Sequence, residues 1–311
     1  MKAGIKVFAP ASVANVACGF DILGFALEKP GDEIIARPLD NKSGLRISKI
    51  SGDNKRLPYE VEKNTAGVAA QRLLEHVGMS DYGIELEIHK RMPFGSGLGS
   101  SAASAAGAVV AVNEVIGRPL ERRELLPFAV LGEQIADGAY HADNVAPALL
   151  GGLVLIRDNP SLDFHRVPVP AGLKVVVLYP HIEILTKDAR NIISNQVKLQ
   201  HHIKQTGNVA ALVLGMMQSN FELISRSLVD HIIEPQRASL IPQFYEVQST
   251  ALEHGALGCS ISGAGPSIFA LFTNSVDAEA AANQMQLVMK SKHIESDIFL
   301  SDINMEGTRI F

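Results

Sequence analysis

The chain has 311 residues, of which 47% are hydrophobic and 20% charged, with a formal net charge of −5 and a sequence pI near 6.1. This composition is typical of a folded globular protein and excludes a disordered one. A net negative chain offers no basic field to a polyphosphate backbone, so we do not expect a dedicated nucleic-acid binder. The length predicts two closely packed domains.

The cysteine content and the lack of long apolar runs indicate the cellular compartment in which the protein works. Cys18 and Cys259 lie in no metal-binding spacing and predict neither a disulfide framework nor a zinc site. Free thiols are typical of a reducing compartment. The first ten residues lack the apolar run of a signal peptide, and no apolar run reaches the roughly 18 residues of a membrane span. We therefore expect a cytoplasmic protein that does not bind membranes.

In the first half of the chain, β-type and helical patterns alternate. Strands are predicted at residues 5–9, 33–37, 45–50, 84–88 and 153–156, and helices at 65–77, 100–115 and 121–136. Residues 10–24 carry too many polar and turn-forming residues for a core strand and are expected to form a loop. Residues 158–170 contain three prolines and predict a linker, with a boundary near residue 168.

The second half of the chain shows a different order of elements. Strands are predicted at 173–178, 259–261, 267–272 and 296–300, and helices at 188–217, 243–254 and 277–290. This is a β-α-β-β-α-β order with extra helices in the first crossover, which favours a ferredoxin-like sandwich. The fold class is therefore α+β, with domains at 1–168 and 169–311.

The stretch PFGSGLGSSAAS at residues 93–104 is a glycine-rich loop that runs directly into an alanine-rich helix. Glycines let backbone amides approach an anion, and a helix N-terminus adds unpaired donors and a partial positive charge. The stretch therefore predicts a phosphate-binding loop. It is neither a Walker A loop nor a dinucleotide-binding fingerprint, because neither pattern occurs in the chain.

Three other stretches carry polar residues beside small ones. GCSISGAGPS at 258–267 fits a wide hairpin turn and is a near miss for a nucleophile elbow, which weakly indicates a hydrolase acting through Ser260 or Ser262. In PASVANVACGFD at 10–21, Asn15 and Asp21 either receive a substrate ammonium or hydroxyl group or cap a turn. Glu133 and Asp137, four residues apart on one predicted helix face, precede HADNVAP at 141–147; either the carboxylate pair forms a solvated face, or the turn at Asp143 and Asn144 aims polar groups at a ligand.

In the order in which they occur along the chain, these stretches resemble the signature motifs of the GHMP kinases. The resemblance covers nearly the whole chain. Residues 10–21 and 141–147 are similar to the homoserine kinases within that family. The resemblance implies a two-domain GHMP kinase fold, with a left-handed β-α-β unit in the N-terminal domain and a ferredoxin-like C-terminal domain. It also implies ATP-dependent phosphorylation of the hydroxyl group of L-homoserine, a step of threonine biosynthesis from aspartate, with Mg²⁺ as cofactor and a homodimeric protein.

The resemblance also implies roles for single residues. Ser101, together with Ser100, and Glu133 would hold Mg²⁺, and Asn64 would lie near the nucleoside. Gly263 and Gly265 would close over the ATP phosphates from the second domain. The residues that would wrap those phosphates are Pro93, Gly95, Ser96, Gly97, Leu98, Gly99, Ser100, Ser101, Ala102 and Ala103.

The homoserine pocket implied by the resemblance combines Asn15, Asp21, His141, Asn144, Thr186, Arg190 and Arg237. Asp21 would bind the amino group and the arginines the carboxylate. Asn15, Asp21, Glu133 and Arg190 form the catalytic set, in which Asn15 and Asp21 orient the substrate and no residue is assigned as general base. In many homoserine kinases a Gly-Pro pair stands where this chain has Ala17 and Cys18. The competing functions are phosphorylation of mevalonate, shikimate or a sugar, and nucleotide binding without catalysis.

Overall fold

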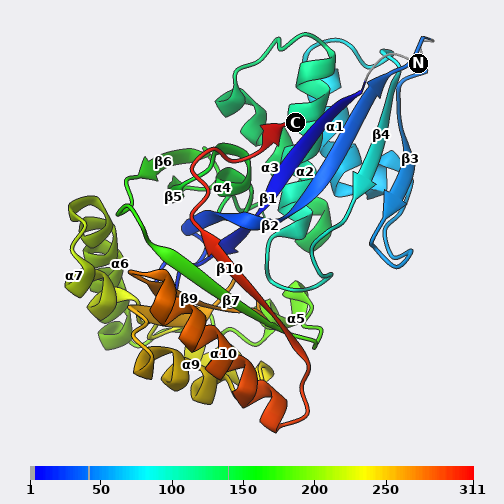
Figure 1. The fold of residues 1–311 in the computed structure, drawn as a ribbon. Helices are drawn as coiled ribbons and strands as arrows, with labels where there is room; N and C mark the ends of the chain where they lie inside the picture. The colour runs from blue at the N-terminus through cyan, green and yellow to red at the C-terminus, as the bar shows by residue number, and fades with distance from the viewer. Residues whose placement is uncertain (1–3, 41–42, 139) are drawn as a thin grey trace.

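A computed structural model describes residues 4–40, 43–138 and 140–311 (Figure 1). The first sheet contains β1 (Ile5–Ala14), β2 (Leu23–Pro38), β3 (Leu45–Ser51), β4 (Ile84–His89), β5 (Leu153–Asp158), β6 (Asp163–Val167) and β11 (Arg309–Ile310). The second sheet contains β7 (Lys174–Pro180), β8 (Gly258–Ile261), β9 (Ile268–Phe272) and β10 (Ser296–Asp302).

The helices are α1 (Thr65–His76), α2 (Ser100–Val115), α3 (Leu126–Asp137), α4 (Val145–Leu150), α5 (Thr186–Asn191), α6 (Leu199–Gln218), α7 (Phe221–Ser227), α8 (Glu234–Arg237), α9 (Phe244–Glu253) and α10 (Ser275–Ser291). Short 3-10 turns lie at Val61–Lys63, Arg122–Leu125 and Ala238–Leu240. None of the helices in the described ranges is long and apolar enough to cross a membrane.

Helix α2 forms the centre of the first domain, because alanine and valine make it apolar on every side. It is buried from Ala102 to Asn113 and packs against β1 and β2 as well as α1, α3 and α4 (Figure 1). A Cβ atom on Gly107 would lie 2.6 Å from Cγ1 of Ile34, so the small residues let the helix approach the sheet closely. This packing fixes the position of the helix N-terminus at Ser100.

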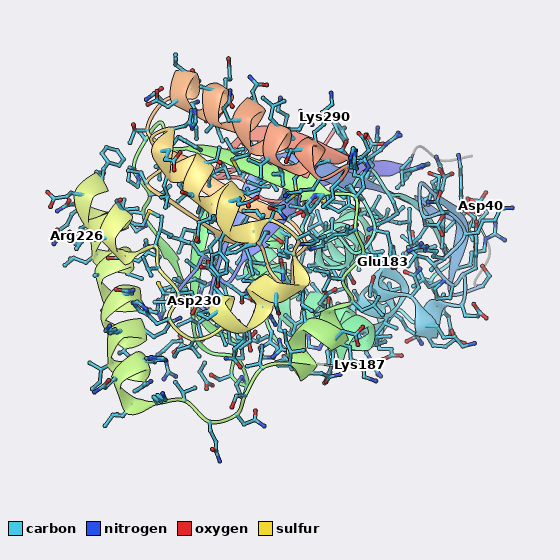
Figure 2. The ribbon with its side chains drawn as sticks, turned by 90° about the horizontal axis from the view of Figure 1, so that it is seen from below. Asp40, Glu183, Lys187, Arg226, Asp230 and Lys290 are labelled. Atoms are coloured by element: carbon cyan, nitrogen blue, oxygen red, sulfur yellow. The ribbon has the colours of Figure 1, made fainter. Side chains whose placement is uncertain are left out.

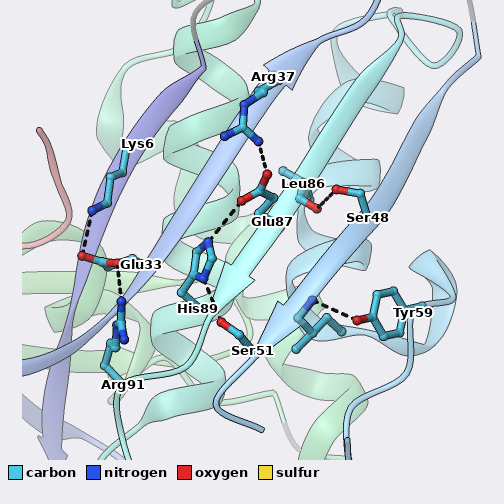
Figure 3. Close-up of polar contacts among 11 residues, drawn as sticks. Lys6, Glu33, Arg37, Ser48, Ser51, Tyr59, Leu86, Glu87, His89 and Arg91 are labelled. Atoms are coloured by element: carbon cyan, nitrogen blue, oxygen red, sulfur yellow. Dashed lines mark hydrogen bonds and ion pairs between the residues drawn. The ribbon is translucent and has the colours of Figure 1, made fainter.

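The other face of the first sheet carries charged side chains in cross-strand pairs (Figure 3). Glu33 pairs with Lys6 at 2.9 Å and with Arg91 at 3.4 Å, while His89 lies 3.2 Å from Glu87 and 2.8 Å from the Ser51 hydroxyl group. Solvent-facing pairs of this kind contribute at most about 1 kcal/mol each. This face is therefore a polar surface, and the core lies on the side of the helices.

The second sheet has the strand order β10-β7-β9-β8, with every neighbouring pair antiparallel. With the connection order β7, helices, β8, β9, α10, β10, this is the predicted ferredoxin-like arrangement. Helices α9 and α10 lie side by side over one face of this sheet (Figure 2). In the first sheet, β3 and β4 are parallel and are joined through α1, which forms the β-α-β unit.

The two domains share a hydrophobic core. The ends of β1 and β2 nearest the second domain pack against β7 and β9, and the ring of Phe25 on β2 meets Phe269 on β9 edge to face, with centroids 5.9 Å apart. Both side chains are fully buried. The last strand, β11, also returns to the first domain and pairs with β1. The predicted boundary at residue 168 stays a prediction.

Four local predictions were wrong. Residues 10–14 continue β1 because small side chains there bury completely beside the glycine-rich loop, and β2 begins at Leu23 rather than after residue 24. Residues 158–170 contain strand β6, which forms a hairpin with β5 and is not a linker. The helix predicted at 188–217 is two helices, α5 and α6, and the helix predicted at 121–136 begins with a 3-10 turn before Pro127.

Phe269→Ala tests the shared core. We expect the variant to lose about 3–5 kcal/mol of unfolding free energy, because it leaves a large cavity between the sheets. Urea unfolding followed by circular dichroism and by intrinsic fluorescence should give one common transition at lower urea. Val276→Ala, at a side chain that is 74% exposed, is the control and should change stability little. Two separate transitions in the parent protein would contradict a shared core.

Candidate active site

The glycine-rich loop joins the end of β4 to the start of α2, and its three alternate glycines have left-handed backbone conformations. The φ angles of Gly95, Gly97 and Gly99 are 63°, 76° and 66°. Residues with side chains adopt this region only with strain, so the spacing of the glycines follows from the shape of the loop. The loop ends at the first turn of α2, where backbone amides lack intrahelical partners.

The second glycine-rich stretch lies directly against this loop. A Cβ atom on Gly97 would come within 2.6 Å of the Ser262 carbonyl oxygen and 2.7 Å of that of Gly265. The Ser262 hydroxyl group donates to the Gly97 carbonyl oxygen at 2.8 Å, and the Ser267 amide donates to that of Ser96 at 3.1 Å. The two stretches, far apart in sequence, form one structure across the domain boundary.

The hydrolase alternative is not supported by this geometry. The Ser262 hydroxyl group is used in the contact with Gly97, and the Ser260 hydroxyl group donates to the Glu234 carboxylate at 2.5 Å. Both serines are buried, at 0% and 2% exposure. Neither hydroxyl group is presented to a substrate as a nucleophile would be.

The predicted pocket residues line one cavity beside these loops. Its lining includes Asn15, Asp21, Glu133, His141, Asn144, Thr186, Arg190, Arg237 and Gly263. The structure therefore brings together every residue that the sequence analysis placed in the homoserine pocket. Phe20, which the sequence analysis did not select, also lines it.

Asn15 links the first loop to the second domain. Its side-chain amide donates to the Gly263 carbonyl oxygen at 2.8 Å, and its Oδ1 accepts from the Asp21 amide at 3.0 Å. On the other side of the cavity, Asn144 Oδ1 accepts from the Ser12 hydroxyl group at 2.8 Å. The bond to Gly263 ties the loop of residues 15–21 to the second domain, and the bond between Asn15 and Asp21 closes that loop on itself.

The cavity is lined by three carboxylates, of Asp21, Glu133 and Asp143, and by two guanidinium groups, of Arg190 and Arg237. Arg190 donates to both Asp21 oxygens at 3.0 Å, and His141 Nδ1 lies 3.7 Å from Asp21 Oδ2. Arg237 donates to the Gly263 carbonyl oxygen at 3.0 Å. Both arginines lie over the Phe20 ring, at 5.5 Å and 5.2 Å from its centroid.

The two arginines repel one another in this enclosed site. Burial, followed by the charge of Arg190, lowers the pKa of Arg237 to about 10. The guanidinium group of Arg237 remains charged at neutral pH, and an anion bound beside it would offset both its desolvation and its repulsion from Arg190. The site therefore favours a ligand that carries a carboxylate, together with a cationic group for Asp21.

The two serines at the start of α2 differ in their surroundings. The Ser100 hydroxyl group donates to Asp32 Oδ2 at 2.8 Å, whereas the Ser101 Oγ atom is buried and has no hydrogen-bond partner among the described residues. Mg²⁺ in phosphoryl-transfer sites commonly takes only one or two protein oxygens besides phosphates and water. Ser101 and Glu133 fit such a site, and the Glu133 carboxylate lines the cavity. The Ser100 hydroxyl group gives its proton to Asp32 but keeps its oxygen lone pairs, so this bond does not prevent it from binding a metal.

Asn64 has a structural role. Its Oδ1 accepts from the amides of Ala66 and Gly67, at 3.0 Å and 3.4 Å, and so caps helix α1. Its side-chain amide donates to the Pro58 carbonyl oxygen. The proximity of Asn64 to the nucleoside stays a prediction.

Sequence reasoning missed two charged residues below the loop, Asp32 and Lys90. They are 0% and 8% exposed and form an ion pair. Lys90 lies three residues before Pro93, so a charged residue at the entrance of the loop was the available signal. Asp32 lies in a strand far from any motif and offered none.

Comparison with known proteins decides the family. The family models of the GHMP kinases N terminal domain and the GHMP kinases C terminal domain match residues 64–152 and 208–291. A homoserine kinase of Chlorobium phaeobacteroides (strain BS1) is 45% identical, over 97% of this chain and 98% of its own length. One from Chlorobium phaeovibrioides is 47% identical, over 98% and 99%. The chain belongs to the homoserine kinases, a family of GHMP kinases.

Solved structures agree with this assignment. The crystal structure of homoserine kinase from Cytophaga hutchinsonii is 50% identical and matches with a TM-score of 0.97, covering 100% of this chain and 98% of the other. A mevalonate kinase matches with a TM-score of 0.73 at 15% identity, over 98% of this chain and 100% of its own, which shows the shared fold alone. The two-domain GHMP kinase fold expected from the sequence is confirmed.

The Ala17 and Cys18 departure from the homoserine kinase pattern has a conformational consequence. Asn15, Val16 and Ala17 have φ angles of 71°, 41° and 58°, so a glycine is the easier residue at position 17. Cys18 is buried, and burial raises the pKa of its thiol to about 12, so the thiol is protonated and unreactive at neutral pH. Cys18 therefore needs no chemical role.

Ala17→Gly should cost much less stability than a typical substitution of alanine by glycine. The relief of left-handed strain, about 1–2 kcal/mol, offsets the extra backbone entropy of glycine, about 0.5–1 kcal/mol, and the loss of a buried methyl group, about 0.8 kcal/mol. Thermal unfolding should therefore show a Tm close to that of the parent protein. Ala70→Gly, in the middle of α1, is the control and should lower Tm. An equal loss of Tm in the two variants would contradict the strain at Ala17.

Proposed function

We propose that this chain transfers the γ-phosphoryl group of ATP to the side-chain hydroxyl group of L-homoserine, giving ADP and O-phospho-L-homoserine in threonine biosynthesis. The observation that carries the proposal is the cavity in which Asp21 faces Arg190 and Arg237, directly beside the glycine-rich loop. This charge pattern is complementary to the ammonium and carboxylate groups of a free amino acid.

The glycine-rich loop and the first turn of α2 would hold the ATP phosphates. Backbone amides from residues 95–101 supply donors that need no rearrangement, which is the main contribution that phosphoryl transfer requires of a protein. The Ser96 Oγ and Ser101 Oγ atoms are buried without hydrogen-bond partners among the described residues, which leaves both available to a ligand. Gly263 and Gly265 approach the loop from the second domain.

We propose Ser101 and Glu133 as the residues that would hold Mg²⁺. When bound there, the ion would neutralise charge on the β- and γ-phosphates. The buried Ser101 hydroxyl group, which has no partner among the described residues, supports this assignment, whereas the Ser100 hydroxyl group already donates to Asp32 at the end of the loop.

The ammonium and carboxylate groups of the substrate would replace the existing ion pair between Asp21 and Arg190, and this replacement would orient the amino acid. Both Asp21 oxygens are bound by Arg190. A ligand with only an ammonium group, or only a carboxylate, would break this pair and leave one partner without a counter-charge. A zwitterion replaces the pair on both sides, so the site selects for amino acids.

Asn15 and Asp21 then act by orientation, and no general base is assigned. After the exchange of the ion pair, the Asp21 carboxylate would pair with the substrate ammonium group, which fits a binding role. In-line attack by the hydroxyl oxygen on the γ-phosphorus forms the new P–O bond and breaks the bond to the bridging oxygen of ADP, while the hydroxyl proton is released to solvent. Positioning supplies most of the rate.

We further propose that residues 1–168 form the ATP-binding domain and residues 169–311 the second domain. A cytoplasmic location and a homodimer are likewise proposals, which rest on the family.

An ADP-release assay with ATP, Mg²⁺ and a panel of acceptors tests the function. L-Homoserine should give turnover, while mevalonate, shikimate and galactose should not. 4-Hydroxybutanoate and 3-amino-1-propanol, which each lack one charged group of homoserine, should lose about a hundredfold or more in kcat/KM, because each leaves one partly buried charge of the Asp21–Arg190 pair without a partner. Turnover with 4-hydroxybutanoate at a similar rate would contradict recognition of a zwitterion.

The same assay tests the metal assignment. Ser101→Ala and Glu133→Ala should each lower kcat by about a hundredfold or more, since each removes a proposed metal ligand. Ser100→Ala, the matched comparison at the neighbouring serine, should lower kcat far less. Equal losses for Ser100→Ala and Ser101→Ala would contradict the distinction between them.

A further inference from the structure

A buried ion pair that the proposed reaction does not use lies at the base of the glycine-rich loop. Asp32, on β2, is fully buried, and Lys90, directly after β4, is 8% exposed. Lys90 Nζ donates to Asp32 Oδ2. Two charges so far from water persist only where further hydrogen bonds satisfy their remaining polar atoms, so the contacts of the pair indicate what it holds.

Asp32 binds both ends of the loop. At the entrance, the amides of Arg91 and Met92 donate to Asp32 Oδ1 at 2.7 Å and 3.1 Å. At the exit, the Ser100 hydroxyl group donates to Asp32 Oδ2 at 2.8 Å. One carboxylate therefore ties together the two points between which residues 93–99 run.

Lys90 adds hydrogen bonds at the end of the loop where α2 begins. Besides Asp32, its ammonium group donates to the Ser100 carbonyl oxygen and to the Ser104 hydroxyl group, both at 2.7 Å. An ammonium group has three protons, and all three are used within the protein. Lys90 therefore has no donor left for a nucleotide, which separates a positioning role from direct binding.

We propose that Asp32 and Lys90 are positioning residues, whose neutral pair holds the two ends of loop 93–99 in the geometry that phosphate binding needs. The inference rests on the proposed function, because it takes this loop as the phosphate site. A loop already held in its binding conformation loses less conformational entropy when the nucleotide binds.

The neutrality of the pair is as important as its hydrogen bonds. The pair lies at the N-terminal end of α2, where the amides attract phosphate. Without Lys90, the Asp32 carboxylate would stay unpaired below the site and repel the phosphates. Replacing both residues with neutral ones removes this repulsion, so the double variant should bind ATP better than the single one.

The test compares Lys90→Met with Lys90→Met/Asp32→Asn, using calorimetric ATP binding together with ADP-release kinetics. Lys90→Met should weaken ATP binding by about tenfold or more, with a smaller loss in kcat and a change below about twofold in the KM for homoserine. The double variant should recover most of the lost affinity. A double variant that binds ATP more weakly than Lys90→Met overturns the proposal.

Leu73→Ala provides a control for general destabilisation, because Leu73 is fully buried in α1. It should lower Tm without changing ATP affinity. If Lys90→Met weakens ATP binding no more than Leu73→Ala, the pair has only a structural role and the proposal fails.

If Lys90→Met does not fold, Ser104→Ala replaces it, because this change removes only one acceptor of Lys90. A roughly twofold to threefold loss of ATP affinity supports the proposal, and unchanged affinity overturns it.

Calorimetry also separates the proposed role of the ion pair from the proposed function of the protein. A parent protein that binds ATP but does not phosphorylate homoserine contradicts the proposed function, while the comparison of the variants still tests the ion pair.

Discussion

The contact between Gly97 and the loop of Ser262 and Gly265 is the constraint on which the rest of the site depends. Two backbone segments from different domains approach so closely that a single Cβ atom at Gly97 would meet two carbonyl oxygens below 3 Å. The phosphate loop is therefore defined by both domains together. The shared core around Phe25 and Phe269 keeps the two sheets in the relative position that this contact requires.

The charges of the site are arranged in two layers around this contact. Below the loop, Asp32 and Lys90 neutralise one another and hold its ends, so the helix N-terminus remains the local positive field. Beside the loop, Asp21 and Arg190 form an ion pair with one another. In the proposed reaction a zwitterion would replace each partner, so these partly buried charges would stay paired before and after binding, which would limit the desolvation penalty of the site.

Local sequence patterns predicted many of the helices and strands, whereas contacts between residues far apart in the sequence were not predicted. The bounds of α2 and the order of strands and helices along the second domain follow from alanine content and strand periodicity, which are local signals. That element order favoured the ferredoxin-like fold, which sets how the strands are arranged in the second sheet. The strand character of residues 10–14 was missed because buried small and polar residues there do not alternate. Asp21 and Arg190 were selected through a family resemblance, whereas their direct pairing across 169 positions is visible only in the structure. Asp32 belongs to no motif, so its role depends wholly on tertiary contacts.

The most direct test of a phosphate loop defined by both domains is the ATP affinity of Gly97→Ala beside Gly78→Ala. Both glycines have positive φ angles, 76° and 71°, but a Cβ atom on Gly78 would meet nothing within 4 Å. Both variants should lose about 1 kcal/mol of stability from backbone strain, and only Gly97→Ala should also lose ATP binding, because its methyl group forces the two loops apart. Equal ATP affinity in the two variants would contradict the account.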